Sequence, residues 1–311
     1  MPQFSTSNLP YNLSTILHSL QCHRSAHITM FLTEKHRLVL VFPSPNRYPL
    51  TDPFDAALSS RLLSLLPIPA SSSATVNNLS WLSRACDLLS LTISDATSLD
   101  PSCFLESTSL PLLDSCNSVS ALSERLLRRV LFVRFSLKSH KTVFPEKKPL
   151  PQLSAVRLLS LMEKPPHGKI DPVQNAICAV EAMSALVIGA IWVTLSGKGE
   201  KYLRGLKVNT EIFAWGKEFN KVLEAASKRI GEGSVDGEME KMEAMIGKLT
   251  AEMDLDGEME KQIFDEMERT CVEIREGLEK LNGSMNAVFQ AALCARNAAV
   301  QSLMVGVQKK C

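Results

Sequence analysis

The sequence predicts an all-α protein, an antiparallel bundle of long amphipathic helices joined by Pro-rich and acidic connectors. Hydrophobic residues make up 45% of the 311-residue chain and aromatic residues only 6%. This composition favours a helical protein with a core of Leu, Ala and Met over a β-sandwich. Apolar residues recur along several segments at spacings of three and four. Clusters of proline, serine and glycine separate these segments and are typical of connectors.

Residues 1–50 are expected to form a poorly ordered N-terminal extension. Residues 1–33 contain no acidic residue and include several Ser and Thr, as an organellar transit peptide does, but they hold a single arginine, Arg24. Met30 begins a new charge pattern. Residues 1–29 therefore either form a transit peptide or lie upstream of the true start, and the sequence leaves both interpretations open.

The first half of the chain contains three predicted helices. The first follows Asp52 and has Pro53 at an early helical position, where proline is well tolerated. The second lies near residues 80–97, and the third runs over about residues 110–137. The third helix has an apolar stripe of Val119, Leu122, Leu126, Val130, Val133 and Leu137.

A basic face accompanies the third predicted helix. Residues 121–170 carry 11 Lys and Arg against 3 Asp and Glu. Four arginines lie largely off the apolar stripe, namely Arg125, Arg128, Arg129 and Arg134. We predict that they form an interaction surface for a protein partner or an anionic membrane, or that they complement an acidic stretch of the same chain. No nucleic acid is expected, because no zinc-finger, basic-zipper or aromatic RNA-binding signature lies beside them.

The middle of the chain combines a connector with its most apolar segment. Residues 138–151 are basic and Pro-rich, and we expect a mobile connector there. Residues 183–195 form an uncharged run of 13 residues, which is shorter than the roughly 20 residues of a membrane-spanning helix. We interpret this run as a central buried helix, and a transmembrane or re-entrant helix is the alternative.

Two more amphipathic helices are predicted in the second half, within a single domain at residues 51–307. One covers residues 208–226 and includes Trp215. The other carries a heptad seam, whose apolar or small residues are Phe264, Met267, Cys271, Ile274, Leu278, Leu281, Met285, Val288, Ala292, Ala295 and Ala299. Because other helices carry similar stripes, the seam favours packing inside one bundle over an extended coiled-coil dimer.

An acidic segment at residues 231–262 is expected to be a second mobile connector. It contains the hexapeptide Asp-Gly-Glu-Met-Glu-Lys twice, at 236–241 and at 256–261, and residues 232–282 carry 16 acidic against 6 basic residues. The spacing of the acids partly resembles a calcium-binding loop, but Ile263 stands where the second copy needs a bidentate glutamate. We therefore expect no metal site and no cofactor.

No residue pattern in the chain indicates an enzyme active site. The sequence lacks His-Glu-x-x-His, Cys-x-x-Cys and Gly-x-Ser-x-Gly. Its eight cysteines are scattered and no secretory signal precedes them, which is typical of reduced thiols in an intracellular compartment. Because catalytic groups can converge from distant positions, an enzyme stays as an alternative, which convergence of His167, Cys178 or acidic residues in a closed pocket would favour.

The order of several motifs resembles the plant BYPASS-related family. The motifs are Phe54-Asp-Ala-Ala-Leu-Ser-Ser-Arg-Leu-Leu63, Leu79-Ser-Trp-Leu82, Leu112-Leu-Asp-Ser-Cys-Asn117, residues 190–196 followed by the helix with Trp215, and residues 276–303. The resemblance covers about residues 50–305 and depends on motif order. The duplicated acidic segment and the histidine-containing N-terminal extension depart from the family pattern.

The resemblance implies a plant-specific, mostly helical developmental regulator linked to control of a root-derived mobile signal. It implies an adaptor at membranes, with exocyst subunits or other secretory machinery among its partners, and a cytoplasmic, membrane-associated or chloroplast location. We therefore expect a noncatalytic adaptor or scaffold. A membrane-anchored regulator that uses residues 183–195 is the alternative. The family's link to a mobile signal also implies, as a further alternative, an enzyme acting on a small signalling precursor.

Overall fold

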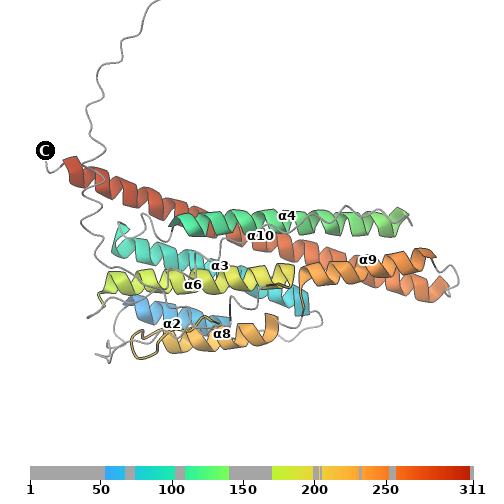
Figure 1. The fold of residues 1–311 in the computed structure, drawn as a ribbon, viewed down its shortest axis with the longest axis horizontal. Helices are drawn as coiled ribbons and strands as arrows, with labels where there is room; N and C mark the ends of the chain where they lie inside the picture. The colour runs from blue at the N-terminus through green and yellow to red at the C-terminus, as the bar shows by residue number, and fades with distance from the viewer. Residues whose placement is uncertain are drawn as a thin grey trace, which may run out of the picture.

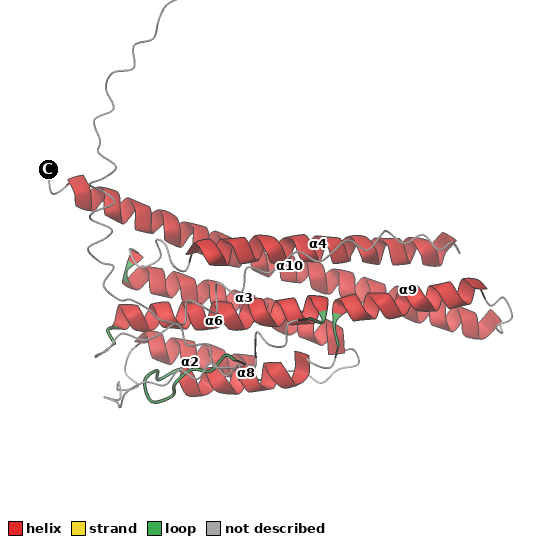
Figure 2. Cartoon of the chain, viewed as in Figure 1, coloured by secondary structure: helices red, strands yellow, loops and turns green. Residues whose placement is uncertain are grey.

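The computed structural model describes residues 53–66, 74–101, 109–139, 170–198, 203, 205–230, 233–251 and 257–308. These residues form an antiparallel helical bundle, and none of them lies in a strand (Figures 1 and 2). The helices are α2 (Pro53–Leu65), α3 (Ala74–Leu99), α4 (Ser109–Ser139), α6 (Pro172–Ser196), α8 (Gly216–Ile230), α9 (Val235–Ala251) and α10 (Gly257–Gln308). The predicted all-α fold class is confirmed. The predictions for residues 1–50 and 140–151 lie outside the described residues.

Helix α6 lies at the centre of the bundle and contacts α3, α4, α8 and α9. The Asp171 side chain caps its N-terminus by accepting a hydrogen bond from the Gln174 amide, and Pro172 follows directly. Gly197 ends the helix in the left-handed conformation at a φ of 66°, which a residue with a Cβ rarely adopts. Every residue from Ala179 to Ser196 is buried, because neighbours surround this part of the helix.

The long helix α10 carries the predicted heptad seam against α3 and α4. Ten of the eleven seam residues are buried, and Phe264 is half-buried. Gly277 has a packing role, since a Cβ there would lie 2.8 Å from the Leu79 side chain of α3. Glycine therefore lets the Leu79 side chain pack directly on the α10 backbone, and a Cβ at this position would push that side chain aside.

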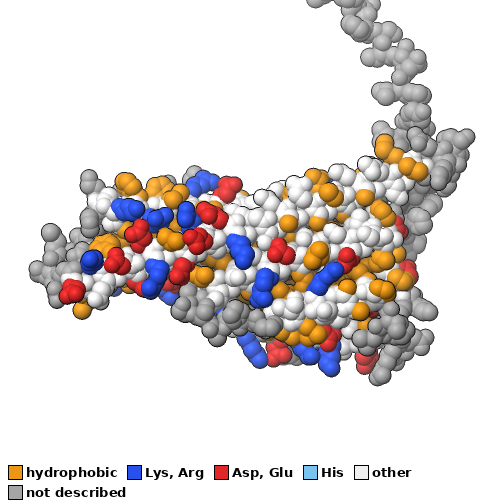
Figure 3. All heavy atoms as spheres, turned by 180° about the vertical axis from the view of Figure 1, so that it is seen from behind, with side chains coloured by type: hydrophobic (Ala, Val, Ile, Leu, Met, Phe, Trp, Pro, Cys, Tyr) orange, Lys and Arg blue, Asp and Glu red, His pale blue; other side chains and the backbone are white. Residues whose placement is uncertain are grey.

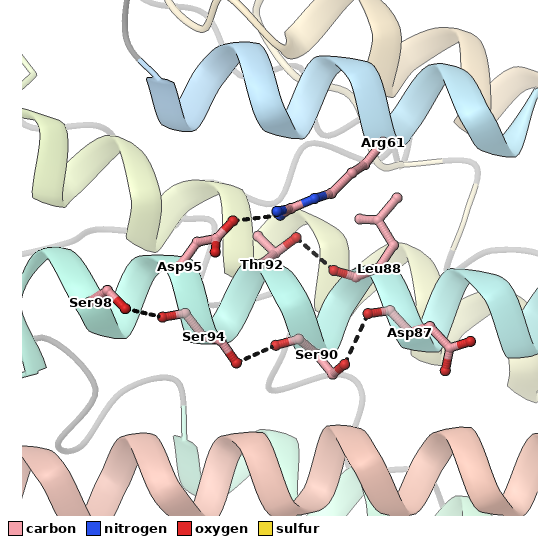
Figure 4. Close-up of polar contacts among 8 residues, drawn as sticks. All are labelled: Arg61, Asp87, Leu88, Ser90, Thr92, Ser94, Asp95 and Ser98. Carbon is pink, nitrogen blue, oxygen red and sulfur yellow. Dashed lines mark hydrogen bonds and ion pairs between the residues drawn. The ribbon is translucent and has the colours of Figure 1, made fainter.

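Polar contacts tie α2 to the rest of the bundle. Figure 4 shows Arg61 of α2 facing Asp95 of α3 in an ion pair, while Ser90 and Ser94 donate to carbonyls of their own helix. Deeper inside, the Trp215 indole N–H donates to the Asn175 side-chain oxygen at 3.1 Å. The Asn175 amide in turn donates to Asp55 of α2 at 2.7 Å, so α2, α6 and the loop before α8 share one chain of buried hydrogen bonds.

Two predicted boundaries differ from the structure. The helix expected over residues 208–226 begins only at Gly216, because the Asn220 side chain bonds both the amide and the carbonyl of Val208 and holds residues 205–215 as a loop. The acidic segment 231–262, expected as a connector, holds α9 and the first residues of α10. The prediction of a connector is wrong over residues 235–251, where a buried stripe forms, consisting of Val235, Met239, Met242 and Ile246.

Helix α9 continues the line of α6 beyond the end of the central helix (Figure 1). Ser234 begins α9 by accepting a hydrogen bond from the Gly237 amide on its hydroxyl oxygen. A Cβ at Gly197 would lie 2.7 Å from that hydroxyl oxygen, so the end of α6 abuts the start of α9. Together α4, α9 and the first half of α10 build one end of the bundle.

Candidate interaction surface

The most deeply buried ionic contact at this end joins α4 to α9. Arg129 is only 7% exposed, and its guanidinium pairs with the Asp236 carboxylate. Its Nε donates a hydrogen bond to Glu243 at 2.9 Å, and its Nη2 forms an ion pair with the same carboxylate at 2.8 Å. Arg129 follows Leu126 by three positions and precedes Val133 by four, so it lies on the edge of the buried stripe of α4. Two carboxylates around one planar guanidinium compensate the charge that burial would otherwise leave unpaired.

The structure divides the four predicted arginines between different surroundings. Arg129 binds α9, and Arg134 approaches Glu268 of α10 at 3.3 Å. Arg128 is exposed and approaches Glu124 of its own helix at 3.3 Å, while Arg125 is half-buried. The basic stretch thus complements the acidic stretch of the same chain through Arg129 and Arg134. Arg128 is the member that keeps a largely solvent-exposed side chain.

An outward-facing stripe on α4, here called the α4 stripe, combines apolar and basic side chains. Its members are all exposed and lie at helical spacing, namely Arg128, Leu131, Phe132, Phe135 and Lys138. Phe135 is 57% exposed, and the stripe is continuous over about three turns. Contiguous exposed apolar side chains on a folded surface are typical of interaction sites.

A groove between α9 and α10 is the second apolar surface at this end. It encloses about 440 Å³, within the range of about 300–1,000 Å³ typical of binding pockets. The groove, here called the methionine groove, is lined chiefly by Met242, Met245, Met259, Ile263 and Met267. Glu238 and Glu266 also line it, with Lys241. Figure 3 shows that Lys, Arg, Asp and Glu gather at this end, around apolar side chains.

Four of the five described thiols are poor nucleophiles because burial disfavours the thiolate, and the fifth, Cys294, is exposed. Burial raises the pKa of Cys116 and of Cys178 to about 12, and that of Cys271 to about 11. These groups therefore stay protonated at neutral pH. Cys178 was one of the groups whose convergence in a pocket would favour the enzyme alternative, and another of them, His167, lies outside the described residues. No cluster of three potential metal ligands occurs among the residues that the structure describes.

Helix α6 is the one described helix that is long and apolar enough to cross a membrane. Its most apolar 18-residue window has a mean hydropathy of 2.1, and 89% of that window is buried inside the bundle. Length and hydropathy alone do not separate a membrane-spanning helix from the core helix of a soluble bundle. The burial agrees with the interpretation of residues 183–195 as a central buried helix.

Comparison of the chain with protein-family models, with curated proteins and with solved structures finds no match to any of them. The candidate surfaces therefore rest on the geometry of this chain alone. Sequence reasoning found Arg128 of the α4 stripe but missed its three apolar members. The available signal was the position of Leu131, Phe132 and Phe135 outside the buried stripe of the same helix. The methionine groove was missed because α9 was taken for a connector.

Proposed function

We propose that this chain is a noncatalytic helical adaptor that binds a protein partner through the α4 stripe. The observation that carries the proposal is the continuous exposure of Leu131, Phe132 and Phe135 on a helix whose opposite face is fixed in the bundle. Aromatic and large aliphatic anchors on a rigid helix contribute most of the affinity in many interfaces. Arg128 and Lys138 flank these anchors and favour a partner whose rim is acidic.

The resemblance to the plant BYPASS-related family suggests the setting of this adaptor. In that setting the partner belongs to the exocyst or to other secretory machinery, and the complex takes part in controlling a root-derived mobile signal during root and shoot development. The intracellular location proposed for it is cytoplasmic or membrane-associated, with the chloroplast as the alternative. The α4 stripe is the surface through which such a partner would be held.

A pull-down with a matched control tests the adaptor. The intact chain, a Leu131→Ser/Phe135→Ser variant and a Leu63→Ser/Leu91→Ser variant are used as baits in plant tissue extracts, and captured proteins are identified by mass spectrometry. Leu63 and Leu91 are also exposed, at 45% and 49%, but lie on α2 and α3. We expect at least one protein whose recovery falls about tenfold with the α4 variant and is unchanged with the control.

Two results would contradict this proposal. Equal capture by the wild type and the α4 variant would show that the stripe is not the binding surface. Loss of the α4 variant's affinity for anionic-lipid vesicles, with no protein partner captured by any bait, would assign the stripe to a membrane surface instead. Circular dichroism of both variants must match the wild type, so that lost binding is not lost folding.

A second candidate function is a membrane-anchored regulator that uses α6. The length of 25 residues and the mean hydropathy of 2.1 favour it, whereas the packing of α6 against four other helices opposes it. An α6 inserted in a bilayer would have to leave these neighbours. Alkaline carbonate extraction of plant membranes distinguishes the two, because an adaptor is released into the soluble fraction and a membrane-spanning chain is retained.

A further inference from the structure

The methionine groove is built by the duplicated acidic segment. Glu238 and Lys241 belong to the first copy of the hexapeptide, and Met242 and Met245 follow it on α9. Met259 belongs to the second copy, and the rest of its wall follows that copy on α10. The two copies thus supply opposite walls of one groove, and this groove is a different surface from the α4 stripe.

The side chains of the groove suit an apolar ligand of variable shape. Met242 and Met267 are buried at 5% exposure each and form its base, while Met245 and Met259 are 43% and 56% exposed at its edge. Methionine is unbranched and polarizable, so a surface rich in it can adapt to different apolar side chains. Large methionines left exposed beside a hollow are typical of a surface that binds another protein.

The charge around the groove selects the partner. Residues 235–251 and 257–273 together carry 10 Asp and Glu against 4 Lys and Arg. Three of these carboxylates, Asp236, Glu243 and Glu268, face arginines of α4. The remaining excess is still acidic. Glu238 and Glu266 line the groove itself, where Lys241 lies 3.7 Å from Glu238 and Arg269 pairs with Glu266. An anionic membrane would be repelled here, whereas a cationic helix would be attracted.

We propose that the methionine groove binds a basic amphipathic helix of a partner protein. Apolar side chains at helical spacing on one face of that helix enter between α9 and α10, and Lys or Arg on its flanks approach Glu238 and Glu266. The inference deepens the adaptor function and rests on it, because it gives the chain a second binding surface beside the α4 stripe. An adaptor with two surfaces can hold two partners together.

Methionine methyl NMR of the full-length chain with model peptides tests the groove. One probe peptide of about five helical turns has leucine on one face and lysine on the other, and its counterpart has glutamate in place of lysine. Single Met→Leu variants assign the signals. We expect the basic peptide to shift the methyl signals of Met245 and Met259 and leave that of Met304 unchanged. Met304 is 66% exposed near the far end of α10 and serves as the control.

Matched variants connect the shifts to affinity. Met245→Glu/Met259→Glu and Glu238→Lys/Glu266→Lys are each expected to weaken the binding of the basic peptide by at least about tenfold, measured by fluorescence anisotropy. The Met304→Glu control is expected to bind as the wild type does. Added salt is expected to weaken binding, because the attraction to the exposed carboxylates is screened.

Three outcomes of the peptide experiments would overturn the assignment. Equal binding of the acidic peptide would remove the role of charge, and shifts confined to methionines outside the groove would place the peptide elsewhere. Groove signals that shift with protein concentration alone, together with self-association in the ultracentrifuge, would assign the groove to a second copy of this chain.

The pull-down separates this assignment from the adaptor proposal. If the groove variants, used as baits, keep every captured protein while the α4 variant loses its partner, the groove assignment fails and the adaptor stands. If the peptide occupies the groove but the α4 variant still captures every protein, the α4 stripe is not the binding surface of the adaptor and the groove assignment stands.

Discussion

The two copies of Asp-Gly-Glu-Met-Glu-Lys have the same six residues and opposite surroundings. In the first copy Met239 is 0% exposed and Asp236 bonds the buried Arg129, because α9 packs against α4. In the second copy Met259 is 56% exposed and lines the methionine groove. Local sequence therefore does not decide whether this methionine stabilises the fold or forms surface. The neighbouring helices decide it, and substitutions at matched positions measure the difference.

The largest effect is expected for Arg129→Ala, which breaks the contact that fixes the first copy. Asp236 and Glu243 would be left as largely buried carboxylates without their shared cation, and loss of one partner from a buried ion pair costs about 3–5 kcal/mol of unfolding free energy. Urea unfolding followed by circular dichroism measures it.

Arg128→Ala is the control, because Arg128 is the neighbouring arginine but is exposed. Its effect on the free energy of unfolding is expected to stay within about 0.5 kcal/mol. If the two alanine variants unfold at the same urea concentration, the ion pairs of Arg129 do not hold α9 against α4.

The next effect in size is expected for Met239→Ala in the first copy. The Met239 side chain is fully buried in the stripe that packs α9, so its removal leaves a cavity, and such changes cost about 2–5 kcal/mol. We expect about 3 kcal/mol by urea unfolding. Hydrogen exchange should show faster exchange of α9 amides than in the wild type, because the loosened helix opens more often. An unchanged stability would mean that α9 is not part of the cooperative fold.

The contrast between α9 and α10 also shows how far the sequence predicts this fold. The seam of α10 follows from its spacing and was predicted with its buried face, and the buried part of α6 was predicted from the uncharged run at residues 183–195. The apolar stripe of α9 was also readable, because Val235, Met239 and Met242 recur at helical spacing. The segment was nevertheless predicted as a connector, because its many acidic residues and Gly237 are typical of a solvated connector.

The candidate surfaces were less predictable because they depend on contacts between distant parts of the chain. Arg129 and Arg128 are adjacent in the sequence, and only the approach of Asp236, 107 residues away, makes one of them structural. The groove likewise exists only where α9 and α10 meet. The duplicated hexapeptide was visible as a repeat, but residue spacing does not predict that the methionine of the first copy is buried and that of the second copy is exposed.

The smallest stability effect is expected for Met259→Ala, which makes the same change in the second copy. Because this side chain is 56% exposed, its loss removes little buried area, and the free energy of unfolding should change by no more than about 0.5 kcal/mol. Binding of the basic model peptide should nevertheless weaken, since one edge of the groove loses its apolar wall. Urea unfolding and anisotropy on the same preparation separate the two quantities. A large loss of stability at Met259 would mean that the second copy is packed as the first is, and the contrast between the copies would then disappear together with the open groove.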